Sequence, residues 1–436
     1  MSKGKMGFWT IVLFGINSII GSGIFLLPNN AMSIIGPASL GVLLFDMLLV
    51  LAMTFCFAEA SGLFKDNGGP YIYAKEAFGN FIGYEVGFLT WITRIIAFST
   101  MGVGFATALG GIMPELSTPL MKNIIVTVIF ALLAIMNLFG VQLFKVIQNM
   151  ATVAKILPFV LFIGMGVFFI DSANFTPLFP GGEYTPGSFG TAAVMLFFTF
   201  TGFESIAVAA SEMENPQKNL PKAILVVICI VAAIYFMLLA CAIGIMGYDL
   251  ANTTVPVQEA FGRIAGSFGV GIVASGTLVS IGALCISSSF VTPYSCLALA
   301  EKGMLPAAMT KRNRFNAPYW CIIASTVIAL LIAYTGSFTF LASISVVSRF
   351  SQYIPTCLSI PVFRKKMPDA PRAFKIPFGP VIPVIAVLTS LWLLAQAKPQ
   401  QLIMGLGAAV IAVPFYYFVY KKQKRGIKTK NKRRRF

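Results

Sequence analysis

The hydrophobic pattern of the chain consists of long apolar runs separated by short polar segments. There are about twelve such runs, each near or above the roughly 20 residues that a helix needs to cross the hydrocarbon core of a membrane. The predicted spans are 8–32, 37–62, 80–110, 122–140, 149–170, 188–211, 221–246, 266–298, 319–335, 338–361, 380–396 and 401–420. This pattern predicts an all-α integral membrane protein with 12 transmembrane helices in a single domain, 1–436.

The middle of the first run contains the stretch Gly21-Ser22-Gly23, which is unusual for a spanning helix. Glycine weakens a helix, and inside a membrane the freed backbone groups must find partners in protein or in a cavity. The positive end of a half-helix at such a break can face an anionic group such as a carboxylate. A second interpretation is a packing notch, where small residues let another helix approach closely.

The sixth run contains a second central interruption, at Thr199-Phe200-Thr201-Gly202-Phe203-Glu204-Ser205. Five spans separate the start of this run from the start of the first, and an odd offset inverts the second unit relative to the first. Paired interruptions in corresponding spans are typical of the binding site of a transporter. The two halves share this layout without a clear residue-level repeat.

Composition and charge support a polytopic membrane protein and give it an orientation. The chain is 57% hydrophobic and 11% charged, and it carries a net charge of +17. Most of its Lys and Arg residues fall in the two tails and the even-numbered loops, so both termini are predicted to be cytoplasmic, in the plasma membrane. We expect the basic tail 421–436 to contact anionic lipid rather than nucleic acid.

Several function classes lack the residues that they require. The chain has no histidine, which removes Ser-His-Asp and Cys-His catalysis. Its seven cysteines are scattered through separate apolar runs, and no P-loop pattern occurs, so no metal site, cofactor or ATP-driven step is predicted. We therefore expect no catalytic residues, and a transporter rather than an embedded enzyme.

Three motifs together resemble the amino acid–polyamine–organocation (APC) superfamily of permeases. They are Gly21-Ser22-Gly23-Ile24-Phe25, Gly202-Phe203-Glu204-Ser205, and Glu214-Asn215-Pro216 with Leu220-Pro221-Lys222. The resemblance implies two inverted five-helix repeats, about 8–170 and 188–363, with broken helices 1 and 6, followed by extra helices at about 380–420. It also implies a secondary transporter that moves an amino acid, as its small-molecule substrate, by alternating access.

The same resemblance assigns a substrate site to the two breaks. Backbone N–H groups at the first break would bind the substrate carboxylate, and carbonyl groups at the second would bind its ammonium. One phenylalanine of the second break would act as a gate over the substrate, although plain packing is the alternative for each ring. The implied residues are Ser22, Gly23 and Ile24 for the carboxylate, Phe198, Thr199 and Thr201 for the ammonium, and Phe198, Phe200 or Phe203 for the gate.

Lys155 is the candidate coupling residue. It lies about ten residues into the fifth span, and a rise of ~1.5 Å per residue puts it near mid-depth. In sodium-coupled relatives a sodium ion lies between the first, fifth and eighth spans, and the resemblance implies that the Lys155 ammonium stands there instead, near Ser288. Transport would then be independent of sodium, with proton symport or amino acid exchange. Snorkelling of Lys155 to the surface is the alternative.

Three further charges fall inside spans, and two interpretations stay open for them. Glu204 is either a second proton site or a structural acid. Arg94 and Arg349 either pair with Glu204, Glu85 or Asp46, or meet the side chain of an acidic substrate. An exchanger for acidic or cationic amino acids, or an amino acid sensor on the same fold, are therefore alternatives.

One more carboxylate has a predicted environment. Glu59 falls near the cytoplasmic end of the second span, so we expect its side chain to be solvated.

Overall fold

A computed structural model describes residues 7–64, 69–140, 156–208, 213–372 and 374–433, and every regular element in these ranges is helical. The α-helices are α1 (Phe8–Ile19), α2 (Gly23–Leu26), α3 (Pro28–Ile35), α4 (Ser39–Ser61), α5 (Pro70–Phe78), α6 (Asn80–Ile112), α7 (Pro119–Leu138), α9 (Ser188–Leu196), α10 (Glu204–Val208), α11 (Pro216–Met246), α12 (Pro256–Glu301), α13 (Tyr319–Ala333), α14 (Phe338–Lys366), α15 (Val381–Gln396) and α16 (Pro399–Arg433). A further apolar helix covers Ile156–Phe169.

Short 3-10 segments occupy several of the connections. They are η1 (Gly36–Ala38), η2 (Pro114–Ser117), η3 (Val167–Phe169), η4 (Ser172–Phe175), η5 (Pro180–Gly182), η6 (Phe197–Phe200), η8 (Gly247–Asn252) and η9 (Ala307–Thr310). Of these, η6 belongs to the predicted sixth span and matters for the site.

Proline marks the start of many helices. The first residue of α3, α5, α7, α11, α12 and α16 is a proline. Its ring fixes a helical φ, and its missing N–H is one that the first turn could not have paired. These prolines give the apolar runs defined starting points.

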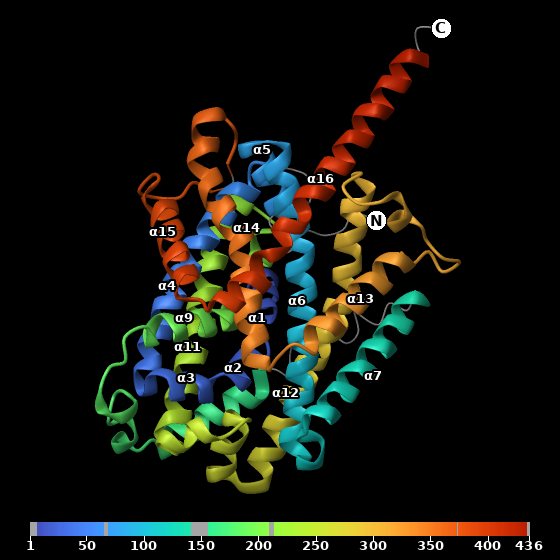
Figure 1. Cartoon of the computed structure of the whole chain (residues 1–436). Coiled ribbons are helices and arrows are strands. Elements are labelled where there is room, and N and C mark those ends of the chain that lie inside the picture. Colours follow the sequence, from blue (N-terminus) through green and yellow to red (C-terminus); the bar gives the residue numbers. More distant parts are fainter. Residues whose placement is uncertain (1–6, 65–68, 141–155, 209–212, 373, 434–436) are drawn as a thin grey trace.

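The helices pack into one bundle whose centre is formed by α6, α12 and α14 (Figure 1). The long helix α6 contacts both α12 and α14, and α4 packs against α11 and α14. By contrast, α7 and α16 lie at the side of the bundle, where they expose large apolar residues such as Leu132 and Val410. Apolar side chains on the outer face are what a lipid-exposed helix requires.

The described part of the chain contains seven helical stretches that are long and apolar enough to cross a membrane, and four shorter apolar helices. The all-helical membrane class predicted from the sequence is therefore confirmed. The number of 12 spans and the inversion between repeats stay predictions. The first span, in particular, is divided into α1, α2 and α3, none of which would span a bilayer alone.

The first interruption lies where the sequence predicted it. Helix α1 ends at Ile19, and Ile20 is extended (φ −66°, ψ 108°) before α2 begins at Gly23. The second interruption runs from Thr201, which is also extended, through Gly202 to Glu204 at the start of α10. Both helices are thus broken near the middle of the bundle.

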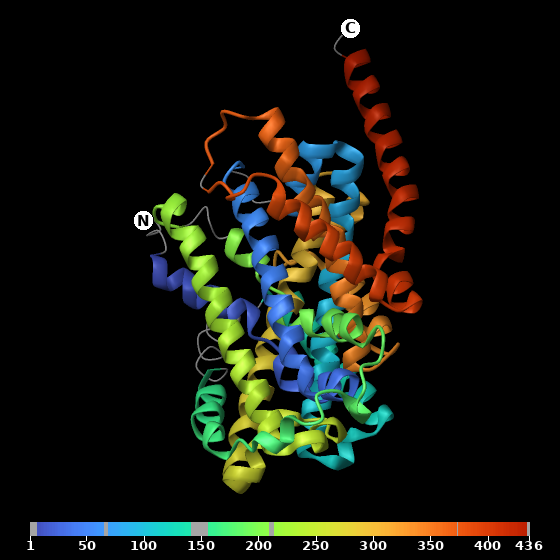
Figure 2. The same ribbon diagram turned by 90° about the vertical axis from the view of Figure 1, so that its left-hand side faces the viewer.

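The two ends of the bundle carry different segments (Figures 1 and 2). The short helix α5 and the C-terminal end of α16 lie at one end, and α16 projects beyond the rest of the molecule there. The Pro- and Gly-rich loop 171–187 lies at the opposite end. The C-terminal tail and α5, which follows the second predicted span, are therefore at one end, and the loop after the fifth predicted span is at the other.

The expectation that Glu59 is solvated is wrong. Its side chain is only 1% exposed and forms a bidentate ion pair with Arg364 at the end of α14, with distances of 2.8 Å and 2.6 Å. The backbone N–H of Ile376 donates to the same carboxylate at 2.8 Å, and Arg372 lies 3.4 Å from it. These four residues, called the Glu59 cluster below, join the ends of α4 and α14 to the segment that leads into α15.

Candidate functional site

A cavity of about 100 Å³ lies between the two helix breaks. Residues of α6, α12 and α14 complete its wall. The lining residues are Ser18, Ile19, Gly21, Ser22, Gly23, Ala97, Met101, Phe198, Thr199, Thr201, Gly202, Leu284, Ser288 and Arg349. Of the residues predicted from the sequence, the cavity wall thus includes Ser22, Gly23, Phe198, Thr199, Thr201, Ser288 and Arg349.

The first break presents backbone to the cavity because its residues are small. A side chain on Gly23 would begin 3.0 Å from the Thr199 side chain and 3.1 Å from the Phe198 ring, closer than ordinary contact. The first N–H groups of a helix have no intrahelical acceptor, and Gly23 leaves those at the start of α2 accessible. The buried Ser22 hydroxyl reaches the sulfur of Met101 at 3.4 Å. Ile24, also buried, starts the apolar face of α2.

The two breaks are in direct backbone contact at Gly202. This residue has φ +106°, and a Cβ atom there would lie 2.2 Å from the carbonyl oxygen of Ser18. Only glycine combines that backbone angle with so close an approach. Gly202, which was predicted to break the helix, is therefore also required for the close packing of the two breaks.

Tyr235 of α11 links the same two breaks from behind. Its buried hydroxyl lies 3.3 Å from the carbonyl oxygen of Ile19 and 3.1 Å from that of Thr199. Both carbonyl groups are at helix ends, where they lack intrahelical donors. Sequence reasoning missed this residue, although a lone tyrosine in the apolar run 221–246 was a signal that could have found it.

The carbonyl groups predicted to bind an ammonium group differ in availability. That of Phe198 accepts from both the N–H and the hydroxyl of Thr201, at 3.1 Å and 2.8 Å. That of Thr199 accepts from Tyr235. The carbonyl group of Thr201 has no such hydrogen bond within the described ranges, so it is the most open of the three.

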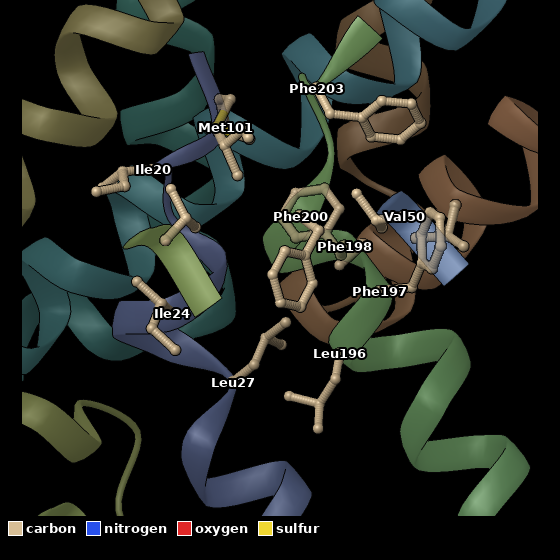
Figure 3. Close-up of a cluster of buried hydrophobic side chains, with 14 of the residues drawn as sticks. Ile20, Ile24, Leu27, Val50, Met101, Leu196, Phe197, Phe198, Phe200 and Phe203 are labelled. Atoms are coloured by element: carbon tan, nitrogen blue, oxygen red, sulfur yellow. The ribbon is translucent and has the colours of Figure 1, made fainter. Parts of the chain in front are cut away.

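The three aromatic candidates for a gate occupy different positions. Figure 3 shows Phe198 on the side of the second break that faces Ile24 and Leu27, and this ring lines the cavity. Phe200 packs against Tyr235, with ring centroids 5.5 Å apart, and Phe203 packs against Tyr353 at 4.9 Å. Phe198 is therefore the ring that a substrate would meet.

Glu204 is held from three directions. One carboxylate oxygen pairs with the guanidinium of Arg349, and the other accepts from the Tyr353 hydroxyl at 3.0 Å and the Gly202 N–H at 3.1 Å. The exposed fractions of the Glu204 and Arg349 side chains are 21% and 14%, and Arg349 lines the cavity. We call these four residues the Glu204 cluster.

The other charged residues predicted for the site have no ion-pair partners in the described ranges or lie outside them. Arg94 of α6 forms no ion pair in the described ranges, and neither do Asp46 and Glu85, whose buried carboxylate oxygens lack hydrogen-bond partners there. Of the three carboxylates considered for the arginines, only Glu204 pairs with one of them in these ranges. Lys155 lies outside the described residues.

Two interrupted helices facing one small, partly polar cavity inside an apolar bundle define a membrane transporter of the broken-helix class. Residues 6–420 match the family described as amino acid permease, and the chain belongs to this family. The resemblance inferred from the three motifs is thereby confirmed.

Curated relatives cover nearly the whole chain. An uncharacterized transporter of Mycobacterium tuberculosis is 30% identical over 89% of this chain and 86% of its own length. The branched-chain amino acid permease BcaP of Bacillus subtilis is 25% identical (96% and 94%), and the serine/threonine exchanger SteT of the same species is 26% identical (97% and 98%). These relatives are transporters and not enzymes, and they differ in the amino acids that their names give.

Proposed function

We propose that this protein is a secondary amino acid transporter of the cell membrane, with both termini cytoplasmic, that works by alternating access. The observation that carries the proposal is the cavity enclosed by both helix breaks. It joins donor groups at the start of α2 to acceptor groups at the end of η6. A zwitterion needs these two kinds of group on opposite sides.

In this proposal the substrate carboxylate binds the N–H groups of Ser22, Gly23 and Ile24. The ammonium binds the carbonyl group of Thr201, which has the fewest described competitors, and those of Phe198 and Thr199. Phe198 covers the bound substrate. Membership of a family with permease and exchanger members supports this assignment.

The coupling part of the proposal rests on sequence alone. Lys155 would take the place of a sodium ion beside the first break and Ser288, and Glu204 would respond to the same changes of charge. Transport would be independent of sodium and would proceed as proton symport or as exchange. Losing the Lys155 charge would loosen the contact between the first and fifth spans and favour opening toward the cytoplasm.

The experiment is uptake of radiolabelled amino acids into proteoliposomes. Internal amino acid, a pH gradient and sodium are each varied alone. We expect saturable uptake without sodium, stimulated by internal substrate or by an inward proton gradient. Binding without any uptake would indicate an amino acid sensor rather than a transporter. An absolute requirement for sodium would contradict the role proposed for Lys155.

Variants at two positions, Gly23 and Lys155, test the residues. Gly23→Ala should lower substrate affinity while the protein stays folded, because its methyl group enters the cavity beside Thr199. Lys155→Ala should lower transport far more than binding, and Lys155→Arg should also fail, because arginine does not release its proton. Wild-type transport by Lys155→Ala would return this lysine to a snorkelling role.

A further inference from the structure

Arg94 occupies a water-accessible position in the interior of the bundle. It is near the middle of α6 (Asn80–Ile112), and its neighbours Thr93, Ile95 and Ile96 are all buried. These neighbours cover the other faces of the helix at this depth. The exposed Arg94 side chain lies on the face of α6 that carries the cavity-lining residues Ala97 and Met101, so it faces a water-accessible space inside the bundle rather than lipid.

This internal space adjoins the cavity between the breaks. Arg94 is three and seven residues before Ala97 and Met101, so the three lie on one face of α6, and the other two line the cavity. On the facing helix α12, Ser288 lines the cavity. One turn further, the Thr292 hydroxyl donates to the carbonyl oxygen of Arg94 at 3.5 Å. The Arg94 guanidinium thus projects from the turn next to the cavity.

The positive charge of Arg94 is not neutralised by the described residues. It interacts electrostatically with Glu204 and Arg349, but Glu204 already pairs with Arg349 and accepts from Tyr353 and Gly202. Among the described residues, these two arginines and one carboxylate leave a net charge of +1 beside the cavity.

A permanent charge at this depth is energetically costly unless an opposite charge or polar groups stabilise it. Arginine keeps its proton in proteins, so it does not escape the cost by becoming neutral. The planar guanidinium matches a carboxylate with two parallel hydrogen bonds. Because Glu204 is already occupied, the site offers no free acid to a cationic side chain, and Arg94 would repel one.

We propose that the transported amino acid carries a second anionic group, and that Arg94 binds it while the first break binds the α-carboxylate. The substrate class is then an amino acid with a net charge of −1 at neutral pH, such as a dicarboxylic amino acid. This inference rests on the proposed transport function and narrows its substrate. It also gives the unpaired Arg94 a partner that is present only when substrate is bound.

A second cavity agrees with an anionic substrate. It measures about 230 Å³ and lies between α3, α9, α14 and the segment that joins α15 to α16. Its polar wall includes Ser343 and Gln401, and Lys398 is its single charged lining residue. A lone cation in a hollow near the end of the bundle raises the local concentration of anions.

The experiment compares acids with amides of the same size. L-glutamate and L-aspartate compete with L-glutamine and L-asparagine for uptake into proteoliposomes that contain the wild-type protein. The ratio of uptake efficiencies, acid over amide, should be at least tenfold in favour of the acid. Arg94→Gln should lower this ratio at least tenfold, and Arg94→Lys should restore part of it.

Arg263→Gln is the matched control, because Arg263 is an exposed arginine in a surface pair with Asp249 at 2.8 Å, away from the cavity. It should leave the ratio unchanged. Uptake of neutral amino acids with no preference for acids in the wild type would overturn the inference and leave the transport function standing. The comparison of acids with amides in the wild type needs no variant, so it tests the inference even if Arg94→Gln does not fold. Absence of uptake for every amino acid would instead refute the transport function itself.

Discussion

The Glu59 cluster and the Glu204 cluster both join a glutamate on one helix to an arginine of α14, but their surroundings differ. Glu59 is 1% exposed and lies at the ends of α4 and α14. Each of its carboxylate oxygens accepts from Arg364, and the Arg372 guanidinium donates to backbone carbonyl groups such as those of Phe363 and Met367. The carboxylate of this cluster is enclosed, and both of its oxygens accept hydrogen bonds from protein groups.

The Glu204 cluster keeps an open side. Its arginine lines the cavity, the Glu204 side chain is 21% exposed against 1% for Glu59, and Arg94 interacts electrostatically with both Glu204 and Arg349. We therefore expect an ion pair inside a membrane protein to have a functional role when one of its charged groups lines a cavity. The enclosed Glu59 cluster is then a structural tie between helix ends.

The largest effect is expected at Gly202, whose N–H fixes Glu204 in place. Gly202→Ala would put a methyl group 2.2 Å from the Ser18 carbonyl oxygen at φ +106°, and backbone strain of this kind costs about 1–3 kcal/mol before the clash is counted. We expect no monodisperse protein in size-exclusion chromatography. Gly41→Ala is the control, because a Cβ atom there meets nothing within 4 Å. A normally folded, active Gly202→Ala protein would contradict the close contact of the breaks.

Glu59→Gln should give the next largest loss of stability. It leaves the charges of Arg364 and Arg372 without their carboxylate in a buried site, and such losses cost roughly 3–5 kcal/mol. Thermal unfolding in detergent measures the change. The control is Glu301→Gln, whose exposed pair with Arg312 at 3.2 Å should contribute less than about 1 kcal/mol. Equal melting temperatures for the two variants would show that the Glu59 cluster does not hold the helix ends together.

Glu204→Gln should have the opposite balance of effects, with a smaller loss of stability and a larger loss of transport. Without its carboxylate partner, Arg349 would be partly solvated by water in the cavity. The free energy of unfolding should therefore fall by only about 2 kcal/mol, less than for a fully buried pair. Uptake should fall by about tenfold or more, because Arg349 lines the cavity and loses its position, and tenfold corresponds to ~1.4 kcal/mol. A stability loss larger than that of Glu59→Gln, with normal uptake per folded molecule, would refute the distinction between the clusters.

Tyr353→Phe should have the smallest effect. It removes one hydrogen bond to Glu204, but the Gly202 N–H still donates to the same oxygen. The expected cost is about 1 kcal/mol in unfolding free energy, with uptake reduced only slightly. A loss of uptake equal to that of Glu204→Gln would assign the Tyr353 hydroxyl a direct part in transport.

Much of the fold and of the cavity could be predicted from local sequence. Gly21, Ser22, Gly23 and Gly202 break helices by their own backbone preferences, so the interruptions were visible without knowledge of packing. Apolar runs of membrane-spanning length gave the helical class directly.

The features that were missed depend on long-range contacts. Tyr235 reaches Ile19 across 216 positions of sequence, and Glu59 reaches Arg364 across 305. Glu59 looked solvated because it lies near a helix end, yet the segment before α15 folds back over it and supplies Ile376 and Arg372. Similarly, the sequence offered three carboxylates as partners for two arginines, and only the tertiary structure brings Glu204, at the start of α10, to Arg349 of α14.

The contact between Gly202 and Ser18 has a mechanical consequence. Two broken helices that touched only through side chains would act as two independent hinges, each able to open alone. Here backbone lies on backbone, and the Tyr235 hydroxyl spans both ends of the joint. We therefore expect the two interruptions to act as a single pivot, so that a tilt of α1 would displace the end of η6 with it. In the proposed transport cycle, a molecule bound at this pivot would touch both arms at once, and binding and opening would share one degree of freedom.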